Sequence, residues 1–139
     1  MMKKFISLYF LYLTILLAMD FLWLYTAGPI FYKKHLGYLM GEKIVIMPVL
    51  VFYLLYALTI TVFILNPVII NQESSFVALL NGLLFGLCSY GTYNLTNHAT
   101  IKNWPMIVTM IDMGWGSFVT GVSVLIAVVL FNTFFFKYY

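Results

Sequence analysis

The sequence has no arginine and few charges of either sign. Its 139 residues carry seven basic side chains, all lysine, and four acidic ones, so that only 8% of the chain is charged. The lysines are scattered, which is not typical of a nucleic-acid-binding surface, and we expect no nucleic-acid partner. A single cysteine, Cys88, cannot form an intramolecular disulfide, and two histidines are too few for a zinc or di-iron site. We therefore expect no metal and no cofactor.

Long apolar stretches make up most of the remaining chain. The residues are 64% hydrophobic and the mean hydropathy is +1.03, more than a water-soluble domain of this size could cover with polar side chains. Because a helix rises about 1.5 Å per residue, about 20 residues cross the hydrocarbon core of a bilayer. Four stretches are long enough, at residues 5–27, 45–66, 76–97 and 107–134.

These spans predict an all-α fold, in which residues 1–139 form one domain, an integral membrane four-helix transmembrane bundle with short loops. The first span follows lysines as a signal peptide would, but it is too long and lacks a small-residue cleavage site, so we expect it to be retained. The N-terminus and the second loop then lie on one face, side A, and the first and third loops on the other, side B. The seven basic residues are divided almost equally between these faces, and the positive-inside rule gives no orientation.

Two aspartates interrupt the apolar spans. Asp20 stands in "LLAMDFLWLY" of the first span, and Asp112 in "VTMIDMGWGSF" of the fourth. A carboxylate in hydrocarbon costs several kcal/mol unless it is paired, hydrated or protonated, so both must face the bundle interior or a wet cavity. Counted from the middle of each span, they lie about 6 and about 12 Å toward side B. We predict that they belong to one polar site; the alternative is that they only fix helix register as hydrogen-bond acceptors.

Aromatic and amide side chains are expected to form the other walls of this site. The third span leads into "YGTYNLTNHATIKNWP", and a helical wheel puts Tyr90, Tyr93, Asn94 and Asn97 of this segment on one stripe. In the second span Tyr53 and Tyr56 are three positions apart, and buried tyrosine hydroxyls need partners. The predicted ligand-binding residues are Asp20, Tyr53, Tyr56, Tyr90, Tyr93, Asn94, Asn97, Asp112 and Trp115.

Small residues indicate where the helices approach closely. The third span contains a G-x-x-x-G spacing, and the fourth has small residues on two faces, which indicates packing on both sides. The expected packing residues are Gly82, Gly86, Gly114, Gly116, Ser117 and Gly121. The pattern D-x-x-W occurs at Asp20 and again at Asp112, but in helices of opposite direction. We interpret that repetition as coincidence rather than as a simple duplication.

Several motifs along the chain follow a recognisable pattern: "MDFLWL", "FYKKHLGYL", "FYLLY", "GLLFGLCSYGTYNLTNHATIKNWP" and "DMGWG". Together they resemble the bacterial membrane-protein family called domain of unknown function 2177, over nearly the whole chain. The resemblance implies a small multi-pass protein of the bacterial inner (cytoplasmic) membrane. The family pattern leads us to expect an aspartate at position 94, where this chain has Asn94, and an amide there hydrogen-bonds without titrating.

Three functions fit these features. We favour binding or transport of a small amphipathic or cationic ligand, with the two intramembrane acids as charge partners. One alternative is an accessory or structural subunit that packs against another membrane protein or forms a homo-oligomer. The other is a membrane-lipid-modifying enzyme, which ranks last because the sequence has no Ser-His-Asp order, metal cluster or nucleotide loop. Membrane lipid is the expected partner in all three.

Overall fold

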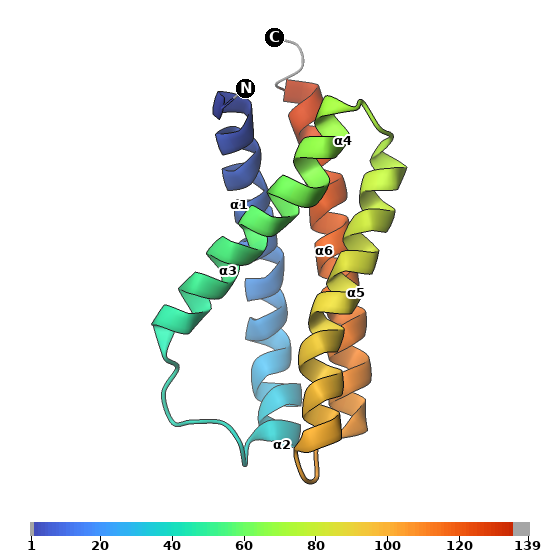
Figure 1. The fold of residues 1–139 in the computed structure, drawn as a ribbon. Coiled ribbons are helices and arrows are strands. Elements are labelled where there is room, and N and C mark those ends of the chain that lie inside the picture. Colours follow the sequence, from blue (N-terminus) through green and yellow to red (C-terminus); the bar gives the residue numbers. More distant parts are fainter. Residues whose placement is uncertain (1, 135–139) are drawn as a thin grey trace.

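The computed structural model describes residues 2–134 and shows four long helices joined by short connections (Figure 1). Each is long and apolar enough to cross a membrane: Met2–Leu36, Ile46–Ile70, Ser75–Thr100 and Met106–Phe134. The described residues contain no strand. The prediction of an all-α transmembrane bundle is therefore confirmed.

The first helix continues beyond residue 27, where the sequence predicted its end. It consists of α1 (Met2–Ala27), a π-helical turn η1 (Gly28–Tyr32) and α2 (Lys33–Leu36). Pro29 has no N–H, and in a regular α-helix its ring would clash with the carbonyl four residues earlier. In the wider turn the N–H of Lys33 bonds to the carbonyl of Gly28, five residues back. The helix thus passes the proline and keeps Tyr32 within the bundle instead of releasing it into a loop.

The second helix also contains a π-helical turn beside a proline. It is built from α3 (Ile46–Ile60), η2 (Thr61–Leu65) and α4 (Asn66–Ile70), and it ends four residues later than predicted. The N–H of Asn66 bonds to the carbonyl of Thr61, just before Pro67 interrupts the regular pattern. The remaining spans, α5 (Ser75–Thr100) and α6 (Met106–Phe134), are uninterrupted α-helices.

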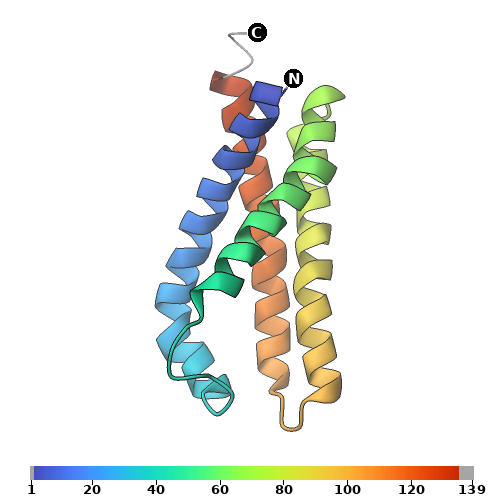
Figure 2. The ribbon, with the colours of Figure 1, turned by 60° about the vertical axis from the view of Figure 1, so that its left-hand side comes forward.

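The four helices alternate in direction, but only three of them are nearly parallel. The beginning of α1 and the α4–α5 connection lie at one end of the bundle, side A, and the other two connections lie at the opposite end, side B (Figure 1). The second helix crosses the bundle obliquely: α4 lies beside α5 at side A, whereas α3 diverges from α5 toward side B (Figures 1 and 2). The backbones of α3 and α5 are therefore farther apart in the side-B half than near side A.

The closest helix pair is α5 with α6, and glycines set its spacing. A Cβ atom at Gly82 would lie 2.8 Å from the Cα of Gly121, and one at Gly86 would lie 2.2 Å from the carbonyl oxygen of Gly116. Ser117 contributes a hydrogen bond from its hydroxyl to the carbonyl of Leu83, at 2.9 Å. By contrast, a Cβ atom at Gly114 would meet nothing within 4 Å. Five of the six expected packing residues thus contact the neighbouring helix, and Gly114 does not.

The core of the side-A half is apolar and comes from all four helices. Its buried side chains pack as one cluster that includes Leu8, Leu16, Ile64, Leu65, Val68, Ala78, Val124, Val128 and Phe131. Exposed apolar side chains are spread along the outside of the spans, as expected for surfaces that contact lipid. The buried charged or amide side chains, Asp20 and Asn94, lie in the side-B half. The buried hydroxyls of Thr61, Thr120 and Ser123, in contrast, lie near the middle of the bundle or beyond it toward side A.

Candidate functional site

Asp20 joins three helices. This aspartate of α1 is only 5% exposed. Its Oδ2 accepts a hydrogen bond from the hydroxyl of Tyr53 on α3, and its Oδ1 accepts one from the indole N–H of Trp115 on α6, at 2.8 Å. Both donors are neutral, so they satisfy the carboxyl oxygens without compensating a negative charge.

Asp112 also accepts a hydrogen bond from a neutral donor at each carboxyl oxygen, but its donors come from other elements than those of Asp20. The hydroxyl of Tyr32, in the π-helical turn η1, donates to its Oδ1, and the amide nitrogen of Asn94, on α5, donates to its Oδ2. Again each donor is neutral. The side chain of Asp112 is half-buried, whereas that of Asn94 is fully buried. Asp112 therefore has a carboxyl group that is fixed by protein donors and still borders open space.

Two stacked tryptophans connect the aspartates. The rings of Trp23 and Trp115 are nearly parallel, with an angle of 9° and centroids 4.4 Å apart. Trp115 donates to Asp20, while the indole N–H of Trp23 donates to the hydroxyl of Tyr32, at 3.1 Å, and that phenol in turn donates to Asp112. The tryptophan of the second D-x-x-W segment, Trp115, thus bonds directly to the aspartate of the first segment. The tryptophan of the first segment, Trp23, is linked to Asp112 of the second through the phenol of Tyr32. The repetition interpreted as coincidence has a reciprocal arrangement in three dimensions.

A cavity of about 380 Å³ borders Asp112 between α3 and α5. We call it the tyrosine cavity; it is lined by Phe52, Tyr56, Ser89, Tyr90, Tyr93 and Asp112. Tyr56 is fixed at its wall by a hydrogen bond to Thr120, at 2.7 Å. Aromatic rings on several sides and a carboxylate at one edge make this space complementary to an apolar molecule that carries positive charge.

A second cavity, of about 410 Å³, reaches Asp112 from side B. We call it the side-B cavity; it is lined by Leu24, Gly28, Tyr32, Leu36, Met40, Ile44, Tyr93, Val108 and Asp112. Its outer wall includes the connection after α2, which a hydrogen bond from Tyr38 to the carbonyl of Asn103 ties to the α5–α6 turn, at 2.9 Å. Asp112 and Tyr93 line both cavities, so the two spaces lie on either side of these residues.

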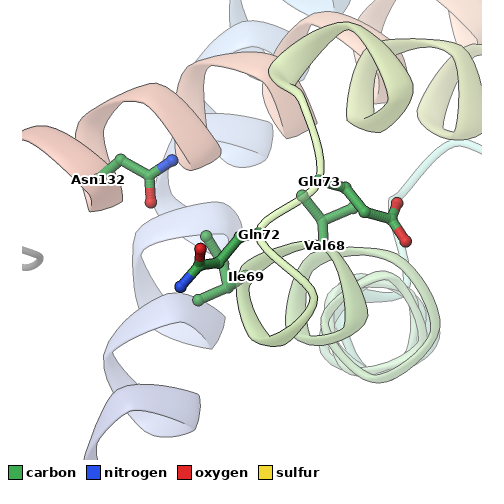
Figure 3. Close-up of a pocket in the computed structure, with 5 residues that line it drawn as sticks. All are labelled: Val68, Ile69, Gln72, Glu73 and Asn132. Atoms are coloured by element: carbon green, nitrogen blue, oxygen red, sulfur yellow. The ribbon is translucent and has the colours of Figure 1, made fainter.

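A further cavity lies at the opposite end of the bundle, and it contains none of the predicted site residues. It has a volume of about 310 Å³ and lies between the α4–α5 connection and the end of α6. Figure 3 shows the amide groups of Gln72 and Asn132 at this cavity, while the carboxylate of Glu73 points away from both. The cavity has no intramembrane charge, and we do not assign it to the candidate site.

Gly116 makes room for one wall of the tyrosine cavity. A Cβ atom at position 116 would lie 2.0 Å from the ring of Tyr90, so this ring can pack against α6 only because the residue there is glycine. One turn further along α5, Asn94 donates to the carbonyl of Tyr90 at 3.1 Å as well as to Asp112. Its Oδ1 is buried without a hydrogen-bond partner. The amide nitrogen must face Asp112, since the reversed amide would place two acceptors together.

The structure brings most of the predicted residues together and adds two. Asn97 is half-buried at the end of α5 and makes no hydrogen bond to either aspartate. Trp23 and Tyr32 were not predicted, yet they link the two carboxyl groups. The repeated D-x-x-W pattern was the signal for Trp23. Tyr32 was missed because Gly28 and Pro29 predicted a helix end before it.

The described residues offer no evident metal site. No group of three or more histidine, cysteine, aspartate and glutamate side chains lies close enough together within residues 2–134 to hold an ion. Each aspartate is surrounded instead by phenol, indole and amide donors. Donors of this kind hold a carboxylate in place, and they are not metal ligands of the carboxylate, thiolate or imidazole type.

Comparison with known proteins gives one match. The model of a family described as "Predicted membrane protein (DUF2177)" matches residues 5–129, which confirms the resemblance drawn from the motifs. No curated protein and no solved structure matches the chain.

Proposed function

The chain belongs to the DUF2177 family of predicted membrane proteins, and we propose that it binds or transports a small amphipathic or cationic ligand at Asp112. The observation that carries the proposal is the position of this carboxylate. It borders both the tyrosine cavity and the side-B cavity, and its hydrogen-bond donors are neutral. A negative charge so placed in a membrane favours a positively charged partner.

The aromatic lining supports the same chemistry. Tyr56, Tyr90 and Tyr93 line the tyrosine cavity, and a cation over an aromatic ring gains about 0.5–1 kcal/mol at an exposed site and about 2 kcal/mol or more where water is excluded. An uncharged amphiphile would gain only apolar contact, and an anionic one would be repelled by the carboxylate. We therefore expect a preference in the order cation, neutral molecule, anion.

The proposal extends to transport because two cavities border one charge. A ligand held at Asp112 borders one space that lies between α3 and α5 and another that lies toward side B. Two approaches to a single binding group let a ligand enter through one space and leave through the other, as the movement of a ligand past a fixed site requires; both approaches lie in the side-B half. Binding comes first in this scheme and is the step to test.

Binding can be measured with three probes that share an octyl chain. Octyltrimethylammonium, octanol and octyl sulfate are titrated into the protein in maltoside micelles, with tryptophan fluorescence and calorimetry as readouts. We expect the ammonium to bind most tightly, and Asp112→Asn to weaken it by about 10- to 100-fold, which corresponds to about 1.4–2.8 kcal/mol. Glu42→Gln is the matched control, because it removes a carboxylate from the exposed side-B connection. Equal binding of the ammonium to the parent and to Asp112→Asn would overturn the proposal.

A further inference from the structure

We propose that the ligand is a long-chain cationic amphiphile that enters from the bilayer between α3 and α5, places its charged head at Asp112 and leaves its chain among the lipid tails. This inference rests on the proposed binding at Asp112 and adds the class of ligand and its route. Four features of the tyrosine cavity support it: its place between the helices, its depth, its closed inner end and its charge.

The cavity lies where α3 leaves the bundle. Phe52 and Tyr56 of α3 line one wall, and Ser89 and Tyr93 of α5 line the facing wall. These two helices approach each other near side A and diverge toward side B, which both views of the ribbon show (Figures 1 and 2). Because Phe52 on one wall and Tyr93 on the other are both exposed on the outside of the bundle, the cavity is taken to open sideways between α3 and α5.

The opening is at the depth of the hydrocarbon core. Asp112 is six residues inside α6, counted from Met106, which is about 9 Å along the helix axis. Phe52 and Tyr93, one from each wall, are 44% and 56% exposed. In a membrane-spanning bundle such exposed aromatic surface at this depth contacts lipid tails. A molecule that enters the cavity beside these two side chains therefore does so from within the bilayer.

The inner end of the cavity toward side A is closed. The ring of Tyr56 meets that of Phe85 edge to face, with centroids 5.8 Å apart, and its hydroxyl is bonded to Thr120. Behind this barrier lies the close-packed apolar core. A long alkyl chain whose head is at Asp112 cannot continue in that direction, so it must leave through the lateral opening or through the side-B cavity.

The lateral opening suits an alkyl chain better than the side-B route. Both cavities have largely apolar linings, so the routes differ in where they end, and the lateral route ends in lipid. The side-B cavity ends at Met40 and Ile44, in the connection after α2, where an alkyl chain would be placed toward headgroups and water at a cost of about 0.8 kcal/mol for each exposed methylene. The head, in contrast, gains from the carboxylate and the surrounding rings.

The route can be read from photo-crosslinking. The probe is hexadecyltrimethylammonium with a diazirine in the middle of its chain, added to the protein in phosphatidylglycerol nanodiscs, whose headgroup has no amine. Adducts are located by peptide mass spectrometry with and without excess octyltrimethylammonium. We expect competed adducts on the outward residues of α3 and α5 beside the opening, around Phe52 and Tyr93, and a loss of at least tenfold in Asp112→Asn.

Two neighbouring residues of α5 give a matched pair of variants. Ser89→Phe adds bulk inside the tyrosine cavity, whereas Cys88→Phe adds the same bulk at an exposed position that does not line it. We expect Ser89→Phe to reduce the competed adduct at least tenfold and Cys88→Phe to leave it within about twofold. If Ser89→Phe does not fold, the adduct positions in the parent protein still decide.

The possible results separate this inference from the proposed function. Competed adducts on Met40, Ile44 or the rest of the side-B connection would overturn the lateral route and leave ligand binding at Asp112 intact. The absence of any adduct that octyltrimethylammonium suppresses would overturn this inference, while the titration with octyltrimethylammonium itself still decides the proposed function. Adducts beside the opening that Asp112→Asn does not reduce would show a lipid contact without charge recognition, which also refutes the inference.

Discussion

Gly86→Ala is expected to force α5 and α6 apart. The added methyl carbon would lie 2.2 Å from the carbonyl oxygen of Gly116 and 2.8 Å from Cβ of Thr120. A carbon and a carbonyl oxygen in close helix contacts approach to about 3.3 Å, so the helices must separate by roughly 1 Å. The carbonyl belongs to the backbone and cannot rotate away as a side chain would. Overpacking of this kind costs about 1–3 kcal/mol, and it displaces Thr120 from its hydrogen bond with Tyr56.

Gly114→Ala is the matched control for this prediction. Its methyl group would meet nothing within 4 Å. Both changes replace a glycine inside a helix by alanine, which by itself favours the helix by about 0.5–1 kcal/mol, so that the difference between the variants isolates the clash. We expect Gly86→Ala to be less stable than Gly114→Ala by about 1–3 kcal/mol. The measurement is unfolding in mixed dodecyl sulfate and maltoside micelles, followed by helical circular dichroism. Equal stabilities would refute the inference that backbone contact sets the α5–α6 distance.

Two further predictions concern the hydrogen-bond network. Tyr53→Phe removes one of the two donors to Asp20 and should cost about 1–3 kcal/mol in the same unfolding assay. Tyr9→Phe loses only an exposed hydrogen bond of 3.3 Å and should change stability by less than about 0.5 kcal/mol; similar losses in the two variants would contradict the role of the network. Trp23→Ala should abolish the exciton circular dichroism of the indole pair, since Trp115 then has no indole stacked on it. Persistence of that signal would mean that the pair does not stack in solution.

Most of the fold follows from the sequence because a bilayer leaves few choices. Backbone groups in hydrocarbon must be bonded within their own segment, so long apolar stretches have to be helices, and short connections make their directions alternate. The predicted helix ends were wrong mainly beside Pro29 and Pro67, where the helices continue beyond residues 27 and 66. A proline normally predicts the end of a helix, but here π-helical turns carry the helix past both residues.

The candidate site could be predicted in part. Depth along each span placed Asp20 and Asp112 in the same half of the membrane, and the need for hydroxyl partners singled out Tyr53. Their actual donors depend on the rotation and tilt of each helix, which periodicity alone does not give. Tyr32 belongs to the network because the first helix continues through η1, beyond its predicted end, whereas Trp23 lies within the predicted span and only its pairing with Trp115 required the structure.

Composition, span length and the two intramembrane acids determined by themselves that this chain is a four-helix membrane protein with a polar region toward side B. Only the tertiary structure decided which side chains are hydrogen-bonded or stacked on one another. Trp115 and Trp23 are each linked by hydrogen bonds to the aspartate of the opposite D-x-x-W segment. The oblique course of α3 places the tyrosine cavity between α3 and α5. The physical reason is that hydrophobicity fixes how deep a residue lies, whereas only the packing of side chains between helices fixes which way it faces.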